Sequence, residues 1–410
     1  VEKFMSRMRS LGVGDGHQVV VYDSTGLFSA ARVWWLFRLM GQDNIAVLSV
    51  ELSEDIVGLG QSVKIRVNLH NYGKNPATGL KVYLKVNGEG KSLSQINLAA
   101  GESNQLLFSH KFQQAGSNLI EVSIDADSLK ADNSYFVSIP VIDELPVLLV
   151  DGDPHDEALK SETDYLNFAL KPFAASASKL KDTIVPQVVN IDHFDAANIN
   201  QSRVMVMANV NRLSEAQLQQ VEDFVGNGGG LMIFPGDKID YSWYNSRFLQ
   251  NGRGLLPMKL GAISSKGAKD DFAGIISQHY EHPALEIFND PRHGSLAGAR
   301  IKHWYKLLQP EAGSVRQNNL TSVAKLDNGD FFMVEKKYGN GRVLLCTIPV
   351  DAAWSNLPLR PFFLPLMQQL TSYLASTVYP SQNLEIGQDI NAFFPVEMLG
   401  KTAVLTTPNG

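Results

Sequence analysis

Alternation of apolar and polar residues marks residues 50–143 as a β-rich region. The segments SVKIRVNLHNYG, LKVYLKVNG and NLIEVSIDAD place apolar side chains at every second position, which is the period of a strand with one buried face. Turn-forming segments such as NYGKNP, NGEG and AAGES separate these runs at a spacing of about ten residues. The pattern predicts an Ig-like β-sandwich over residues 50–143.

Residues 144–382 instead combine short, fully apolar runs with helical periods. Strands are predicted at PVLLVD, RVMVMA, GLMIF and GRVLLC, and the sequence LSEAQLQQVEDFVG predicts a helix. Ser214 stands at the N-cap position of this helix, and Gln217 completes a capping box three residues later. Fully apolar strands that alternate with helices predict an α/β domain whose mostly parallel sheet is covered on both faces.

The two ends of the chain predict smaller pieces of structure. Residues 1–49 contain the strand QVVVYD, the helix AARVWWLFRLMG and the strand IAVL, a unit too small to bury both faces of its own sheet. Residues 383–410 contain INAFFPVE and TAVLTTPNG, which predict the start of a truncated β module.

Composition narrows the classes of protein to consider. The chain has 410 residues and a net charge of −6, and the absence of a long basic run argues against a nucleic-acid groove. The amino-terminal segment lacks the apolar core of a signal peptide, and no window is long and apolar enough for a membrane span. The chain is therefore expected to be soluble. The one cysteine, Cys346, excludes an internal disulfide bond.

The predicted exit of the strand GLMIF is the corner where many α/β enzymes carry a nucleophile. Pro235, Gly236, Asp237 and Lys238 follow this strand, and none of them has a nucleophilic hydroxyl or thiol group. Cys346 lies inside an apolar strand and is expected to be an inert core residue. We therefore predict no catalytic residue, no cofactor-binding residue and no metal ligand.

The carboxyl ends of the predicted parallel strands carry acids and amides, in the segments DGDP, NVNR, PGDK and PVDAAW. Open α/β sheets bind ligands at this edge. The predicted ligand crevice comprises Asp151, Asp153, Asn209, Asn211, Asp237 and Asp351. This mixture suits a polyol or a sugar better than a phosphate.

Two hypotheses of a metal site remain open beside the predicted polyol or sugar crevice. Asp151 and Asp153 could pair on a divalent cation, and a metal-dependent hydrolase would use Asp151, Asp153 or Asp237, although aspartates at strand ends more often cap helices and bind loop amides. His279 and His282 have a spacing that some zinc sites use, but His282 precedes a proline, which favours a turn before a helix.

Residues about 4–48 contain VVVYD, GLFSAARVWW and GQDNIAVL, and this region resembles part of the first rhodanese domain of thiosulfate and 3-mercaptopyruvate sulfurtransferases. In that family a catalytic cysteine lies on a loop of the second domain. Here SVELSED follows AVL, and the chain contains no cysteine-centred loop of that kind. The resemblance therefore transfers no catalytic residue.

Residues about 50–410 resemble the extracytoplasmic part of BatA-like bacterial membrane proteins, the aerotolerance-regulator N-terminal family. PVLLVDGDP, ANVNRLSEAQLQQVEDFVGNGGGLMIFPGD and WSNLPLRPFFLPLMQQLTSYL carry this resemblance. It implies a CARDB-like sandwich, then a class I glutamine-amidotransferase-like domain of flavodoxin-like fold, with membrane spans in the natural protein. Where the amidotransferases have a nucleophilic cysteine, this sequence has the turn PGD.

The resemblance implies a noncatalytic scaffold or interaction region on the extracytoplasmic side of a bacterial inner membrane. Its implied partners are membrane-bound von Willebrand-type and MoxR-type ATPase system proteins. Alternative functions are a rhodanese-type sulfurtransferase and a binder of polyols or sugars. Residues 1–49 are either a fused sulfurtransferase fragment or a native unit that packs on the sandwich.

Overall fold

The computed structural model describes residues 45–52, 57–125, 133–174, 182–266, 271–276, 279–308 and 319–376, together with residues 383 and 402. The chain divides into two compact units, Val1–Val141 and Ile142–Gly410. Most of the predicted strand–helix–strand unit at the amino terminus and nearly all of the predicted carboxyl-terminal β module lie outside the described residues.

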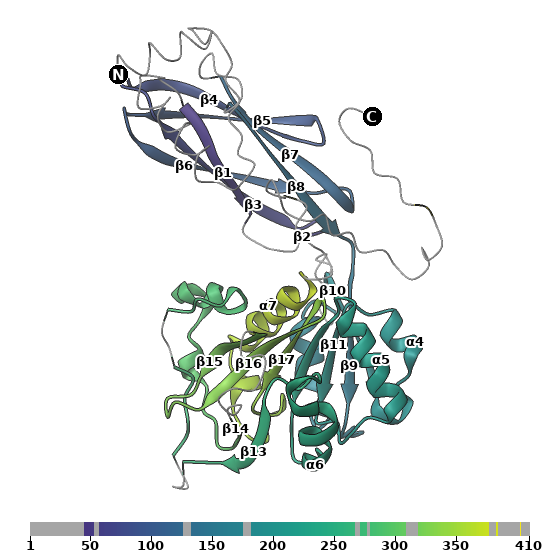
Figure 1. Ribbon diagram of the computed structural model, residues 1–410. Helices are drawn as coiled ribbons and strands as arrows, with labels where there is room; N and C mark the ends of the chain where they lie inside the picture. Colours follow the sequence, from purple (N-terminus) through teal and green to yellow (C-terminus); the bar gives the residue numbers. More distant parts are fainter. Residues whose placement is uncertain are drawn as a thin grey trace, which may run out of the picture. The chain divides into compact units, whose positions relative to one another are not determined.

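The first unit is a sandwich of two sheets, as the alternating pattern predicts (Figure 1). Val63, Ile65, Val67 and Leu69 alternate with more exposed residues along one strand and join the core between the sheets. One sheet has the order β1 (Ile45–Leu52), β3 (Ser62–Asn71), β6 (Ser103–Lys111). The other has the order β2 (Val57–Gly58), β8 (Ser134–Ile142), β7 (Gly116–Ile124), β4 (Ala77–Val86), β5 (Glu89–Leu98).

The segment IAVL at residues 45–48 belongs to this sandwich. Its apolar run predicts the second strand of the amino-terminal unit, whereas the structure places it in the first half of β1, antiparallel to β3. A short apolar run is compatible with either sheet, and the pairing with β3 decides between them.

The second unit contains a seven-stranded sheet, visible in the lower part of Figure 1. The first five strands in its spatial order are parallel to one another, and the last two pairings in that order are antiparallel. The order is β10 (Ile184–Asn190), β9 (Leu145–Asp151), β11 (Val204–Ala208), β12 (Gly230–Phe234), β17 (Gly341–Cys346), β16 (Phe331–Tyr338), β15 (Leu320–Lys325). A separate pair is formed by β13 (Lys259–Ser264) and β14 (Trp304–Leu308).

Helices cover both faces of this sheet, which explains why its central strands are apolar throughout. The helices are α3 (Asp164–Leu170), α4 (Ala196–Asn200), α5 (Glu215–Gly226), α6 (Tyr241–Trp243) and α7 (Phe363–Ala375). Leu218 and Val221 of α5 share a core cluster with Leu231 and Ile233 of β12. Gly230, on the alternate face of that strand, lies against Leu374 of α7. None of the helices in the described ranges combines the length and the hydropathy that a membrane span needs.

Short helical turns occupy several connections between the strands and helices of the second unit. The capping box at Ser214 and Gln217 is present at the start of α5. The turns are η1 (Ile191–His193), η2 (Tyr244–Phe248), η3 (Gln250–Gly252), η4 (Pro283–Asn289), η5 (Pro291–His293), η6 (Leu296–Gly298) and η8 (Leu357–Leu359). Trp243 and Trp304 are buried, whereas Tyr241 of α6 is 42% exposed.

The order of the strands reverses beside β9. The chain leaves β9 for β10 on one side and then crosses to β11 on the other side. The connections that follow β9 and β11 therefore diverge at the carboxyl ends of two neighbouring strands, a position where open α/β sheets usually bind ligands.

Candidate functional site

Three strand exits meet in close contact at the reversal point. A Cβ atom built on Gly152, after β9, lies 2.1 Å from the backbone oxygen of Asn209, after β11. A Cβ atom built on Gly236, after β12, lies 2.4 Å from Cγ of the same asparagine. Both positions therefore require glycine, and the two glycines hold Asn209 between neighbouring loops.

The side chain of Asn209 joins these loops by hydrogen bonds. Its Nδ2 donates to Oε1 of Glu162 at 2.7 Å and to Oδ1 of Asp237 at 3.0 Å. Its Oδ1 accepts from the backbone N–H of Lys238 at 2.9 Å, which fixes the orientation of the amide. Asn209 is fully buried and has a φ of 50°, a left-handed conformation that asparagine tolerates better than most residues.

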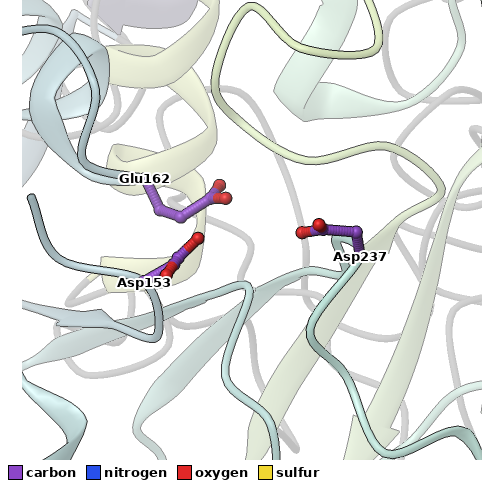
Figure 2. Close-up of side chains that lie close together, drawn as sticks. All are labelled: Asp153, Glu162 and Asp237. Atoms are coloured by element: carbon purple, nitrogen blue, oxygen red, sulfur yellow. The ribbon is translucent and has the colours of Figure 1, made fainter.

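Three carboxylates converge next to Asn209. One oxygen each from Asp153, Glu162 and Asp237 lies within 4.8 Å of the others. Figure 2 shows the carboxylate of Asp237 facing those of Asp153 and Glu162. Glu162 is only 7% exposed, whereas Asp153 is half-buried and Asp237 is exposed. The cluster thus has a buried floor and a side open to solvent.

Burial and mutual repulsion make this cluster electrostatically costly. Burial first, and then the charge of Asp351, raise the pKa of Glu162 to about 8 despite the hydrogen bond from Asn209. Burial is also the main reason that the pKa of Asp351 is raised, with further contributions from Asp237 and Asp153. The carboxylate of Asp351 therefore belongs to the same charged rim.

Two basic side chains approach the open side of the cluster. Lys238 Nζ and His155 Nε2 each lie 3.6 Å from Oδ2 of Asp153. Both side chains are about half exposed, at 49% for Lys238 and 51% for His155. Solvent screens such pairs, so they offset only part of the repulsion among the carboxylates.

Two of the predicted crevice residues have structural roles instead. Asp151 is buried, and it accepts from the Thr163 hydroxyl at 2.7 Å and from the Asp153 backbone N–H at 3.0 Å. Asn211 donates from Nδ2 to the backbone oxygen of Lys238. Both side chains use polar groups to hold the loops that carry the cluster.

The turn after β12 is anchored from a distant strand. The hydroxyl of Tyr305, in β14, donates to the backbone oxygen of Gly236 at 2.9 Å. Burial, followed by the charge of Asp237, raises the pKa of this hydroxyl to about 12, so Tyr305 remains a donor at neutral pH. The anchor fixes the position of Asp237 relative to Asn209.

No activated nucleophile stands at the described rim. Cys346 has no exposed surface, and burial raises the pKa of its thiol to about 12. The hydroxyl of Ser161 contacts the backbone of His155 and not its imidazole ring. The hydroxyl of Thr163 is bound to a carboxylate, so none of these groups has a histidine side chain positioned as its base.

His282, one of the two predicted candidates for a zinc ligand, is buried and bonds to other residues of the second unit. Its Nδ1 accepts from the Ala284 backbone N–H at 3.3 Å at the start of η4. Its Nε2 lies 3.2 Å from Oε2 of the buried Glu335, which also pairs with Arg342 at 3.2 Å. The turn predicted after His282 is present, and both ring nitrogens already have protein partners.

The structure therefore brings together four of the six predicted crevice residues, namely Asp153, Asn209, Asp237 and Asp351. It adds Glu162, which sequence analysis missed. The signal for Glu162 is the acidic segment SETD between β9 and α3, inside the connection that leaves the reversal point. A hollow of about 380 Å³ lies elsewhere, beside Arg253, Lys336 and Lys337, and does not include these residues.

Comparison with known proteins identifies the first unit. Residues 45–134 match the CARDB family model. A CARDB domain from Pyrococcus furiosus, solved in complex with di-metal ions, is 21% identical and covers 25% of this chain and 96% of that chain, with a TM-score of 0.23. A cytoplasmic protein from Salmonella typhimurium is 12% identical and covers 56% of this chain and 98% of that chain, with a TM-score of 0.41. At these TM-scores, neither structural likeness supports a functional argument.

Short stretches are similar to sulfurtransferases. Thiosulfate/3-mercaptopyruvate sulfurtransferase 2 of Arabidopsis thaliana is 53% identical over 47 residues, 12% of this chain and 14% of the relative. The 3-mercaptopyruvate sulfurtransferase of Escherichia coli K12 is 33% identical over 85 residues, 20% of this chain and 30% of the relative. The chain spans less than a third of the length of either relative.

Fold and site together define a chain of two units, an Ig-like CARDB sandwich followed by an α/β unit with an acidic cluster at the ends of its parallel strands. The similarity to sulfurtransferases is partial.

Proposed function

We propose that this chain is a noncatalytic binding region. In this proposal the CARDB sandwich mediates interaction outside the cell, and the α/β unit presents a ligand site at the carboxyl ends of its strands. The convergence of Asp153, Glu162 and Asp237 at the reversal of strand order carries the proposal. The complete burial of Cys346 supports the noncatalytic part, since sulfur transfer requires an accessible thiolate.

The BatA-like resemblance gives this proposal its biological setting. The order β10-β9-β11-β12-β17 corresponds to the flavodoxin-like arrangement, which supports an amidotransferase-like fold. The Pro235–Gly236–Asp237 turn, which has no thiol, fits a binding role for such a fold. An extracytoplasmic scaffold that engages von Willebrand-type and MoxR-type ATPase system proteins is the corresponding proposal for location and partners.

A polyol or sugar is the second candidate for what the α/β unit binds. Asp153 and Asp237 offer partly exposed carboxylate oxygens, and Asn209 holds Asp237 in place. Carboxylates accept hydrogen bonds from the hydroxyl groups of such ligands. This arrangement favours neutral, hydroxyl-rich molecules over anions, because the rim itself is negatively charged.

Two measurements on the whole chain test the proposal. First, thiosulfate-to-cyanide sulfur transfer is measured for the wild type and for Cys346→Ala, with no cysteine-dependent turnover expected. Such turnover would overturn the noncatalytic assignment. Second, a panel of monosaccharides and inositol is titrated by calorimetry into the wild type and Asp237→Asn. Binding that Asp237→Asn abolishes supports the sugar candidate, and absence of binding removes it.

The partner proposal has its own test. The whole chain is immobilised, and purified MoxR-type ATPase and von Willebrand-type protein are passed over it. Saturable binding supports an interaction region of the BatA-like kind. Absence of binding by both proteins contradicts that assignment. The ligand site is tested separately by the calorimetric titrations.

A further inference from the structure

We propose that Asp153, Glu162 and Asp237 bind a divalent cation and that this cation is calcium. The inference deepens the proposed ligand site and rests on it. Its starting point is the distance among the three carboxylates, which each contribute an oxygen within 4.8 Å of the others. Three groups of like charge at this separation repel one another unless a proton or a cation lies between them.

The buried floor of the cluster supplies a second observation. Oε2 of Glu162 has no hydrogen-bond partner among the described residues, although the whole residue is only 7% exposed. Its carboxylate is directed toward Asp237 across the cluster (Figure 2). A buried carboxylate oxygen without a partner is unfavourable, and polar groups that remain so in a folded protein call for a ligand. A cation between Glu162 and Asp237 provides that partner.

The type and spacing of the ligand atoms favour calcium. Carboxylate oxygens are ligands for hard cations, whereas zinc and copper sites usually include histidine or cysteine. Two oxygens on one ion are separated by at most twice the ion–oxygen distance, which is roughly 4.6–5.2 Å for calcium and about 4.0–4.2 Å for magnesium. The three oxygens lie within 4.8 Å of one another, so every separation up to this limit fits calcium, whereas magnesium fits only separations below about 4.2 Å.

The surrounding residues position the ligands without occupying the site. Asn209 donates to Glu162 and Asp237, so it orients both carboxylates while its own carbonyl oxygen is used by the Lys238 backbone. The competitors are the ammonium of Lys238 and the imidazole of His155, each 3.6 Å from Oδ2 of Asp153. Because both side chains are about half exposed, they can turn toward solvent when an ion binds. Water molecules on the open side can complete the six to eight ligands that calcium takes.

Calorimetry on the chelator-treated whole chain tests the site directly, with calcium chloride and then magnesium chloride as the only titrants. We expect one calcium ion per chain, with a dissociation constant on the order of 10⁻⁴ M and weaker binding of magnesium. Glu162→Gln and Asp237→Asn should each weaken calcium binding by at least about tenfold. Asp156→Asn is the matched control, because it removes the same charge from the loop after β9 without touching the cluster.

Thermal unfolding with and without calcium distinguishes a variant that has lost calcium binding from a variant that folds poorly. Calcium should raise the melting temperature of the wild type and of Asp156→Asn, and it should raise that of Asp237→Asn by much less. Absence of calcium binding at millimolar concentrations would overturn the proposal, as would equal affinity in the wild type and both cluster variants. Tighter binding of magnesium would overturn the choice of calcium. Since no sugar or protein partner is present, these outcomes are separate from the tests of the proposed function.

Discussion

Replacing Gly152 with alanine tests whether the contact between the β9 and β11 exits is as tight as the structure indicates. The added Cβ atom would stand 2.1 Å from the backbone oxygen of Asn209 and 2.4 Å from its carbonyl carbon. Carbon–oxygen contacts between backbones settle at roughly 3.3 Å or more, so the two loops would have to separate by about 1 Å. The obstructing atoms belong to a backbone and cannot rotate away.

The expected cost has two parts. Overpacking of this kind typically costs about 1–3 kcal/mol. The separation would also weaken the hydrogen bonds from Gly152 N to Ala208 O and from Asn209 N to Phe234 O, each 2.9 Å long. Each is worth about 0.5–1.5 kcal/mol net. We therefore expect Gly152→Ala to lower the free energy of unfolding of the α/β unit by about 2–5 kcal/mol, and its melting temperature by at least about 5 °C.

The assay is thermal and urea unfolding of the whole chain, followed by circular dichroism. Gly226→Ala is the matched control, because the nearest atom to its added Cβ is Tyr338 Cε1 at 3.9 Å and the residue ends helix α5. That variant should be neutral or more stable by up to about 1 kcal/mol. If Gly152→Ala unfolds within about 0.5 kcal/mol of the wild type, the inferred close contact is wrong.

Three further predictions concern other parts of the α/β unit. Ser214→Ala should lower the free energy of unfolding by about 1 kcal/mol in urea, because the Ser214 side chain accepts from the Gln217 N–H, while Ser214→Thr should lose much less. Glu335 has a lowered pKa: burial opposes its ionisation, but hydrogen bonds from His282 and Tyr373 and the charge of Arg342 outweigh burial. Its contribution to stability is present above the ordinary pKa of 4.5 and is lost as the pH falls through the native value, so an acid titration of unfolding should be flatter for Glu335→Gln than for the wild type. The thiol of Cys346 should resist Ellman's reagent in the native protein and react after unfolding, since it has no exposed surface; rapid native reaction would contradict its burial.

The sequence predicts best those features whose causes are local. Alternation in β3 places Val63, Ile65 and Val67 inward, and it predicts a sandwich without any knowledge of the partner strands. The capping box at Ser214 and Gln217 is equally local, because three residues of spacing decide both hydrogen bonds. The position of Asp153, Asn209 and Asp237 on one rim follows from the general rule that parallel strands end at the same edge.

The remaining features depend on contacts between distant segments. Asp151 and Asp153 look equivalent in the sequence, yet Asp151 is bound by Thr163, twelve residues further along, and only Asp153 reaches the cluster. Glu162 enters the cluster because Asn209, in the loop after another strand, donates to it. The segment IAVL, similarly, is assigned by its pairing with β3 and not by its own composition.

The pairing of β12 with β17 has a consequence for how the chain is synthesised. Residues 235–340 separate the two strands, and α7, which packs against Gly230 of β12, lies still further along the chain. When β9 to β12 have left the ribosome, β12 therefore has an apolar edge that lacks β17 and an apolar face that lacks α7. This native cover is complete only when translation has passed residue 375. Until then the nascent polypeptide depends on chaperones or on transient collapse to avoid aggregation, and Asp351 reaches the acidic rim only after β17 has been synthesised.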